Sequence, residues 1–158
     1  MFDFIVIPEF REALEADYAE MQRCAQVKAW KSVHVLAGSI AEALLIDYLA
    51  ATSHATRPSK DPLRFDLAQA VDVCKNEGLL TQRSADLTSV LRSYRNLIHP
   101  GRVIRLAEEQ PTESSATIAL KLVSIIAAQV EAKRSETFGL TAEQVVKKIG
   151  SCYYNGYY

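Results

Sequence analysis

The fold is decided by residues 30–51, which read WKSVHVLAGSIAEALLIDYLAA. Apolar side chains recur there at steps of three and four residues, which is the period of an α-helix with one wide apolar face. That face comprises Val33, Leu36, Ala37, Ile40, Ala41, Leu44, Leu45 and Tyr48. Because so wide an apolar face must be covered by other parts of the chain, the stretch predicts a core helix of a helical domain.

The same period continues on both sides of this stretch. Before it, a helix is expected to begin at Pro8, whose missing N–H costs nothing in a first helical turn. Its apolar positions are Phe10, Leu14, Tyr18, Met21 and Ala25. After it, helices are expected over residues 63–77, 81–99 and 112–136, with a short last helix over 141–149. Residues that cap or end helices set these limits, namely Asp61-Pro62, Gly78, Pro100-Gly101 and the capping box that starts at Thr141.

Two further stretches complete the expected architecture. Phe2–Ile7 is a short apolar run that forms either a strand-like arm or a lead-in packed on the helices, and residues 52–62 predict a loop. The residues of the 112–136 helix expected to face inward are Ile118, Leu122, Ile125, Ile126 and Val130. No β-hairpin signal and no βαβ alternation occurs. The sequence therefore predicts an all-α, four- to five-helix up-down bundle with a short C-terminal helix.

Length and composition fit a single globular domain. The chain has 158 residues, of which 49% are hydrophobic and 23% are charged. These values exclude a disordered, collagen-like or low-complexity chain. We expect one helical domain over residues 1–158, with its core over about 8–136 and a short helix and Tyr-rich tail over 137–158.

The cysteines and the N-terminus predict a cytoplasmic protein. The three cysteines, Cys24, Cys74 and Cys152, are widely spaced and form no CxxC or Cys-His cluster, so neither a metal site nor a cofactor is expected. An odd, sparse count suits a reducing compartment. The N-terminal residues lack the basic start of a signal peptide, and the apolar stretch 116–130 contains Lys121 and is shorter than the roughly 20 residues of a membrane span.

Charge is unevenly distributed along the chain. The net charge is only −1, so overall charge does not indicate a nucleic-acid partner. Residues 1–50 carry four basic and eight acidic residues, a net charge of −4. Residues 79–105 carry five arginines and one aspartate, a net charge of +4. Arginine binds phosphate through two parallel hydrogen bonds, so this segment is a candidate phosphate-binding region, although a solvated face that pairs with the acidic first helix would look the same.

The candidate site lies in residues 91–101, which read LRSYRNLIHPG. On a helix, Arg92 and His99 are about 20° apart and Arg95 and His99 about 40° apart, so the three side chains share one face. Asn96 flanks His99. Cleavage of RNA by its own 2′-hydroxyl needs proton transfer near neutral pH, which histidine supplies, and a cation on the phosphate, which arginine supplies. We therefore interpret His99 as the proton-transfer residue and the two arginines as the phosphate-binding residues, without a metal ion.

Additional RNA contacts are expected close to this face. Arg102 and Arg105 continue the cationic segment, and Tyr94 could stack on a base, although core or interface packing is the more common reason for a tyrosine there. A histidine in a last helical turn is also favoured by the helix dipole alone. His34 lies on the apolar face of residues 30–51 and is expected to be a packed or interface histidine, and Cys24 and Cys74 to be small core residues.

These residues resemble the signature of the HEPN domains (higher eukaryotes and prokaryotes nucleotide-binding). That signature is an arginine, four to six residues and a histidine, often with a polar residue directly after the arginine. Arg92 and His99 have six residues between them, whereas Arg95 has the following Asn96 but only three residues before His99, so either arginine could be the motif residue. Residues 36–45, which contain Glu42, are similar to the second helix of bacterial HEPN-like proteins, and the resemblance covers about Lys28 to Lys133.

The resemblance implies a helical bundle that forms a homodimer, in which two copies of the motif build one ribonuclease site. It implies a toxin or antiviral effector that cuts tRNA or mRNA, with an antitoxin or regulatory protein as a possible partner and no membrane association. Other members of the family are non-catalytic modules that bind RNA, a nucleotide or a protein, and that alternative stays open here. Glu42 could orient an arginine across the bundle or cap a buried polar contact, and we favour the structural role. A third possibility is a purely structural helical adaptor.

Overall fold

A computed structural model describes residues 1–52, 61–95, 101 and 110–138. Over these residues the chain is all-helical and contains no β-strand, which confirms the predicted all-α class. The helices are α1 (Pro8–Gln26), α2 (Trp30–Thr52), the short 3₁₀ helix η1 (Pro62–Arg64), α3 (Leu67–Asn76), α4 (Gln82–Arg95) and α6 (Glu113–Phe138). The expected loop at 53–60 and the expected last helix and tail at 139–158 lie outside the described residues.

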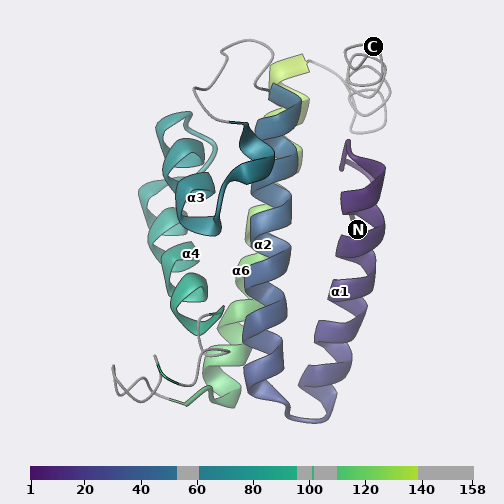
Figure 1. Ribbon diagram of the computed structural model, residues 1–158, viewed down its shortest axis with the longest axis vertical. Coiled ribbons are helices and arrows are strands. Elements are labelled where there is room, and N and C mark those ends of the chain that lie inside the picture. The colour runs from purple at the N-terminus through teal and green to yellow at the C-terminus, as the bar shows by residue number, and fades with distance from the viewer. Residues whose placement is uncertain (53–60, 96–100, 102–109, 139–158) are drawn as a thin grey trace.

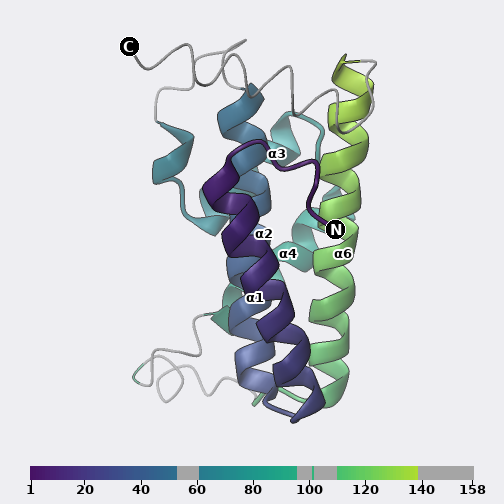
Figure 2. The ribbon, with the colours of Figure 1, turned by 90° about the vertical axis from the view of Figure 1, so that its right-hand side faces the viewer.

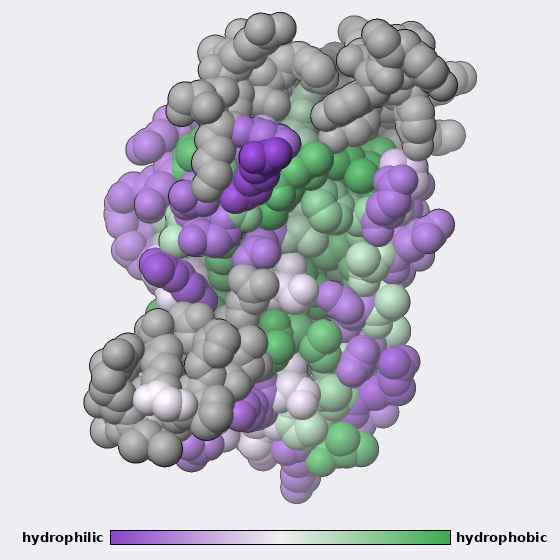
Figure 3. All heavy atoms as spheres, viewed as in Figure 1, coloured by the Kyte–Doolittle hydropathy of each residue, from purple (hydrophilic) through white to green (hydrophobic). Residues whose placement is uncertain are grey.

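The central element is α2, which contacts α1, α3, α4, α6 and η1. Figures 1 and 2 show α1 on one side of α2, α3 and α4 on the other, and α6 running alongside α2 in the same direction. Most of α2 is buried, and the predicted apolar face is confirmed, with Val33, Ile40 and Leu44 completely inaccessible and Leu36 partly buried. On the face seen in Figure 3, hydrophobic residues gather along the middle, over α2, between more hydrophilic surfaces on either side. The sequence therefore predicts the buried face of α2 correctly.

The N-terminal segment is a packed lead-in rather than a strand. Phe2, Phe4, Ile5 and Val6 are buried, and no strand is assigned there. The Phe2 ring makes edge-to-face contacts with Phe4 and with Tyr18 of α1, at centroid separations of 6.5 and 5.7 Å. Such pairs add specific geometry to the burial of large apolar rings. The segment before Pro8 is thus part of the hydrophobic core.

The predicted helix over 63–77 was wrong in its first part. The Asp61 side chain accepts the Leu63 N–H at 3.0 Å and opens only the single turn η1. The chain then becomes extended at Phe65, and α3 starts afresh from a capping box at its own N-terminus. There the Asp66 carboxylate accepts the Gln69 N–H at 2.9 Å, and the Gln69 side chain accepts the Asp66 N–H at 3.2 Å. The predicted end is close, because Gly78 adopts a φ of 71° just after the helix.

The predicted inner face of α6 was only partly right. Leu122, Ile126 and Val130 are buried as expected, but Ile118 and Ile125 are 56% and 45% exposed. Apolar residues surround nearly the whole middle of this helix, so the sequence pattern does not single out the face that packs on α2. The helix also extends beyond the predicted end, to Phe138.

Two helices are long and apolar enough to span a membrane when only length and composition are considered. They are α2, with 67% of the relevant window buried, and residues 113–136 of α6, with 39% buried. Core helices of soluble proteins meet the same criterion, so this is weak evidence for a membrane.

Candidate functional site

The helix that carries the arginine-rich motif is α4. Thr81 caps its N-terminus, since its side chain accepts the Ser84 N–H at 3.2 Å. Ala85, Thr88 and Leu91 are buried along one face, and the Thr88 hydroxyl donates to the Ser84 carbonyl at 2.7 Å. That buried face packs against α2 and fixes the rotation of α4 about its axis.

Arg92 is exposed, although helical spacing places it only about 20° around the helix axis from the buried Ala85 and about 40° from the buried Thr88. Its side chain borders a small cavity between α3 and α4. The cavity is lined by Leu67, Ala68, Val71, Asp72, Thr88, Ser89 and Arg92. Its volume is about 50 Å³. A cavity of this size admits water but no nucleotide. An RNA phosphate would therefore meet Arg92 at the open surface and not inside this cavity.

The remaining predicted site residues lie at or beyond the end of α4. Tyr94 and Arg95 form its last two positions, so the backbone confirms the helical spacing of three residues between Arg92 and Arg95. Asn96, His99, Arg102 and Arg105 lie outside the described residues. The closeness of His99 to the two arginines therefore stays a prediction from helical spacing.

Glu42 is half-buried on α2. Asp47, one and a half turns further along α2, forms an ion pair with Arg134 of α6. The two side chains are 0% and 1% exposed. The sequence analysis missed this pair. Asp47 offered a signal, because it is a charged residue in the middle of an apolar stretch, whereas Arg134 lies in the polar stretch 131–136 and offered none.

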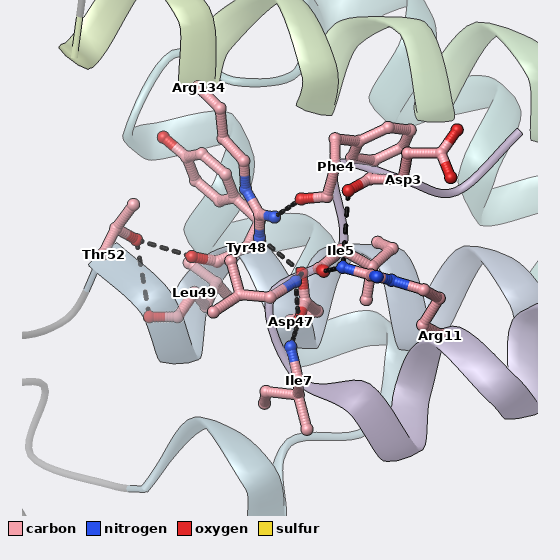
Figure 4. Close-up of polar contacts among 11 residues, drawn as sticks. Asp3, Phe4, Ile5, Ile7, Arg11, Asp47, Tyr48, Leu49, Thr52 and Arg134 are labelled. Atoms are coloured by element: carbon pink, nitrogen blue, oxygen red, sulfur yellow. Dashed lines mark hydrogen bonds and ion pairs between the residues drawn. The ribbon is translucent and has the colours of Figure 1, made fainter. Parts of the chain in front are cut away.

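The Asp47–Arg134 pair binds the N-terminal segment to the two helices (Figure 4). The Asp47 carboxylate accepts the N–H groups of Val6 and Ile7, the latter at 2.9 Å, where α1 is about to begin. Arg134 donates one hydrogen bond to Asp47 and another to the Phe4 carbonyl. Buried polar groups of this kind are costly unless paired, so the cluster holds one arrangement of the segment, α2 and α6. Because it is inaccessible to solvent, we assign it a structural role.

His34 is the packed histidine that the sequence predicts. Its Nε2 lies 2.9 Å from the Ser115 hydroxyl of α6, and its side chain is 1% exposed. Burial lowers the pKa of His34 from 6.5 to about 4. The ring is therefore neutral at pH 7, and its pKa is too low for efficient proton transfer near neutrality.

Cys74 and Tyr48 are equally unsuited to act as nucleophiles. Burial, and then the negative charge of Glu77, raise the pKa of the Cys74 thiol well above its usual range. Burial, followed by the charges of Glu77 and Cys74, raises the pKa of Tyr48 to about 12. Both groups stay protonated at neutral pH, and the thiolate is the reactive form of cysteine. Cys74 is thus a core residue as predicted, and Cys24 packs half-buried against the same core.

No protein-family model matches the chain, and neither a curated protein nor a solved structure matches it. The resemblance to the HEPN signature accordingly rests on the quoted residues alone. The described residues add that Arg92 is exposed near the C-terminal end of α4, on the side of the helix that carries the buried Ala85 and Thr88.

Proposed function

We propose that this protein is a metal-independent endoribonuclease of the HEPN type that cleaves RNA through attack by the RNA's own 2′-hydroxyl. In this proposal it acts as a homodimer in the cytoplasm, as a toxin or an antiviral effector, on tRNA or mRNA. The observation that supports the proposal is the exposed Arg92 near the C-terminal end of α4, followed by Arg95 on the same helix and then by His99 in the sequence.

Each residue of the motif has a defined task in this mechanism. His99 transfers the proton, Arg92 and Arg95 bind the phosphate and stabilise the negative charge that builds up as the bond breaks, and Asn96 positions these groups. Arg102, Arg105 and Tyr94 hold the neighbouring RNA, and Glu42 supports the bundle from α2. The requirement for a 2′-hydroxyl makes RNA, and not DNA, the substrate.

The exposure of Arg92 suits this task physically. A phosphate at the protein surface can accept both parallel N–H groups of a guanidinium, which a buried arginine such as Arg134 could not offer to RNA. Arg83 provides a contrast on the same helix. It is also exposed, but it precedes Arg92 by nine residues and therefore points about 180° away around the helix axis.

The experiment that tests the proposal is RNA cleavage in EDTA by the wild-type protein and by His99→Ala, Arg92→Ala and Arg83→Ala. We expect cleavage by the wild type with 2′,3′-cyclic phosphate ends, and loss of at least about 100-fold in rate for His99→Ala, the usual size of a general acid–base contribution. Arg92→Ala should lose activity as well, whereas Arg83→Ala, a matched arginine on the opposite side of α4, should retain it.

Other results would favour the alternatives. No cleavage of tRNA or mRNA, together with RNA binding that Arg92→Ala abolishes and Arg83→Ala does not, would indicate a non-catalytic binding module. RNA affinity that is absent, or unchanged after both Arg92 and Arg95 are replaced, would indicate a helical adaptor without a nucleic-acid site. Equal cleavage by the wild type and His99→Ala would contradict the proposed mechanism directly.

A further inference from the structure

A line of exposed side chains, apolar except for Lys121, runs along the face of α6 that points away from the rest of the bundle. It consists of Ile118, Lys121, Ile125, Ala128 and Ala132, which we call the outer stripe. All five are exposed, Ile118 to 56% and Ile125 to 45%. Their spacing of three, four, three and four residues places them in one narrow line along the helix. In Figure 2, α6 forms one edge of the molecule, so none of the other labelled helices covers this line from outside.

The apolar surface continues from the outer stripe onto α4. Leu87 and Val90 of α4 are 36% and 47% exposed. They border a shallow groove that also includes Ile118 and Leu122 of α6. Four large apolar side chains are thus exposed on two adjacent helices, Leu87 and Val90 on α4 and Ile118 and Ile125 on α6. A contiguous apolar surface of this kind on a folded domain marks a contact with another molecule.

The order of side-chain sizes along the outer stripe indicates what that molecule is. The large residues Ile118, Lys121 and Ile125 occupy its N-terminal half, and the small residues Ala128 and Ala132 its C-terminal half. Two copies of the stripe aligned antiparallel bring large residues opposite small ones, with Ile125 opposite Ala128 and Lys121 opposite Ala132. A two-fold axis between the copies makes both halves of the contact identical. The stripe is therefore complementary to itself.

Charge favours the same antiparallel alignment. Lys121 lies on the outer stripe, and the exposed Glu131 lies next to Ala132. In the antiparallel pair, Lys121 of one copy approaches Glu131 of the other. In a parallel pair, Lys121 would lie opposite a second Lys121, and the like charges would repel each other. Within one copy the two residues are ten positions apart, about 15 Å along the helix, too far for an ion pair.

We propose that a second copy of this chain binds the outer stripe through its own, with the two α6 helices antiparallel. This inference specifies the interface of the homodimer in the proposed function and rests on that proposal for its biological meaning. It also has a consequence for the site. The part of α4 that precedes Arg92 lies beside the N-terminal part of α6, so the two Arg92 residues come to opposite ends of the dimer. Each copy then keeps a separate site, unlike the shared site that the HEPN resemblance implies.

The test is the state of association of the full chain, measured by sedimentation velocity over a wide range of concentrations without RNA. We expect a dimer for the wild type. Ile125→Glu places a charge at the centre of the contact and should raise the dissociation constant at least about 30-fold, the effect of losing one strong interface residue. Ala16→Glu introduces the same side chain at an exposed position of α1, away from the stripe, and should leave the dimer intact.

A charge exchange tests the orientation. Lys121→Glu should weaken the dimer, and adding Glu131→Lys should restore it, because the two residues meet only between copies. Failure of this rescue would overturn the antiparallel alignment. A monomeric wild type, or an Ile125→Glu dimer as tight as the wild type, would overturn the interface as a whole. So would a monomer that binds vesicles of phosphatidylcholine and phosphatidylserine through Ile125, since the stripe would then face lipid.

These outcomes are separate from those of the ribonuclease test. An intact dimer without cleavage contradicts the proposed function and leaves the interface standing. Cleavage by a protein that is monomeric at every concentration contradicts the interface and leaves the ribonuclease assignment standing. Far-UV circular dichroism should show that each variant is folded, because every substituted side chain is exposed.

Discussion

The two faces of α6 are both apolar, yet one is buried within the bundle and the other is exposed. Ile126 and Val130 on the inner face are completely inaccessible, whereas Ile118 and Ile125 on the outer stripe are about half exposed. Only the inner face carries a charged residue buried among apolar ones, Arg134, and its partner Asp47 comes from α2. The comparison shows that hydrophobicity alone does not define a core face. The partners that surround a face decide what its residues contribute.

Removal of the Asp47 carboxylate should lower the free energy of unfolding more than the other substitutions proposed for α2 and α6. Asp47→Ala leaves the Arg134 guanidinium buried without its counter-charge and frees the Val6 and Ile7 N–H groups. Breaking a buried pair in this way costs about 3–5 kcal/mol. We expect the free energy of unfolding in urea to fall by that amount. The double variant Asp47→Leu with Arg134→Met should recover much of the loss. An Asp47→Ala protein as stable as the wild type would show that the pair does not hold the bundle together.

A neighbouring pair of isoleucines compares the two faces directly. Ile126→Ala removes a completely buried side chain and should lower the free energy of unfolding by about 3 kcal/mol, within the range for cavity-forming substitutions. Ile125→Ala makes the same chemical change one residue earlier at a half-exposed position, and should cost under about 1 kcal/mol when the protein is dilute. Its cost should grow with protein concentration if the outer stripe binds a second copy. Equal costs for both variants at low concentration would remove the distinction between the faces.

Much of the inner face follows from the sequence, and the outer stripe shows why the rest does not. The period of apolar residues in 30–51 predicts α2 and its buried face correctly, because apolar residues recur on that face at steps of three and four and few polar residues lie among them. In α6 the apolar residues surround the helix, so Ile118 and Ile125 look like core residues to any rule based on spacing. A face that contacts another molecule can carry apolar residues at the same spacing as a core face, and a single chain's sequence does not separate the two.

Pairs of distant polar residues were also beyond sequence reasoning. Asp47 and Arg134 are 87 positions apart, and nothing local in either helix names the partner. The break between η1 and α3 depends on a competition between two caps, Asp61 and Asp66, that propensity alone does not resolve. Of the candidate site, spacing correctly predicts that Arg92 and Arg95 share a helix, while the position of His99 stays a prediction.

The free energy of unfolding should also depend on pH through His34. This effect should be smaller than the largest effects of the substitutions above. The folded protein holds its pKa at about 4, below the ordinary value of 6.5 that applies when the chain is unfolded. The unfolded chain therefore binds a proton first as the pH falls, and stability that is complete above about pH 6.5 is lost progressively towards pH 4. Between pH 7 and pH 5 the loss should be about 2 kcal/mol, measured by urea unfolding at each pH. His34→Gln keeps a polar side chain near Ser115 but cannot titrate, so this part of the pH dependence should disappear. A His34→Gln protein with an unchanged pH profile would show that other groups, and not this histidine, weaken the fold in acid.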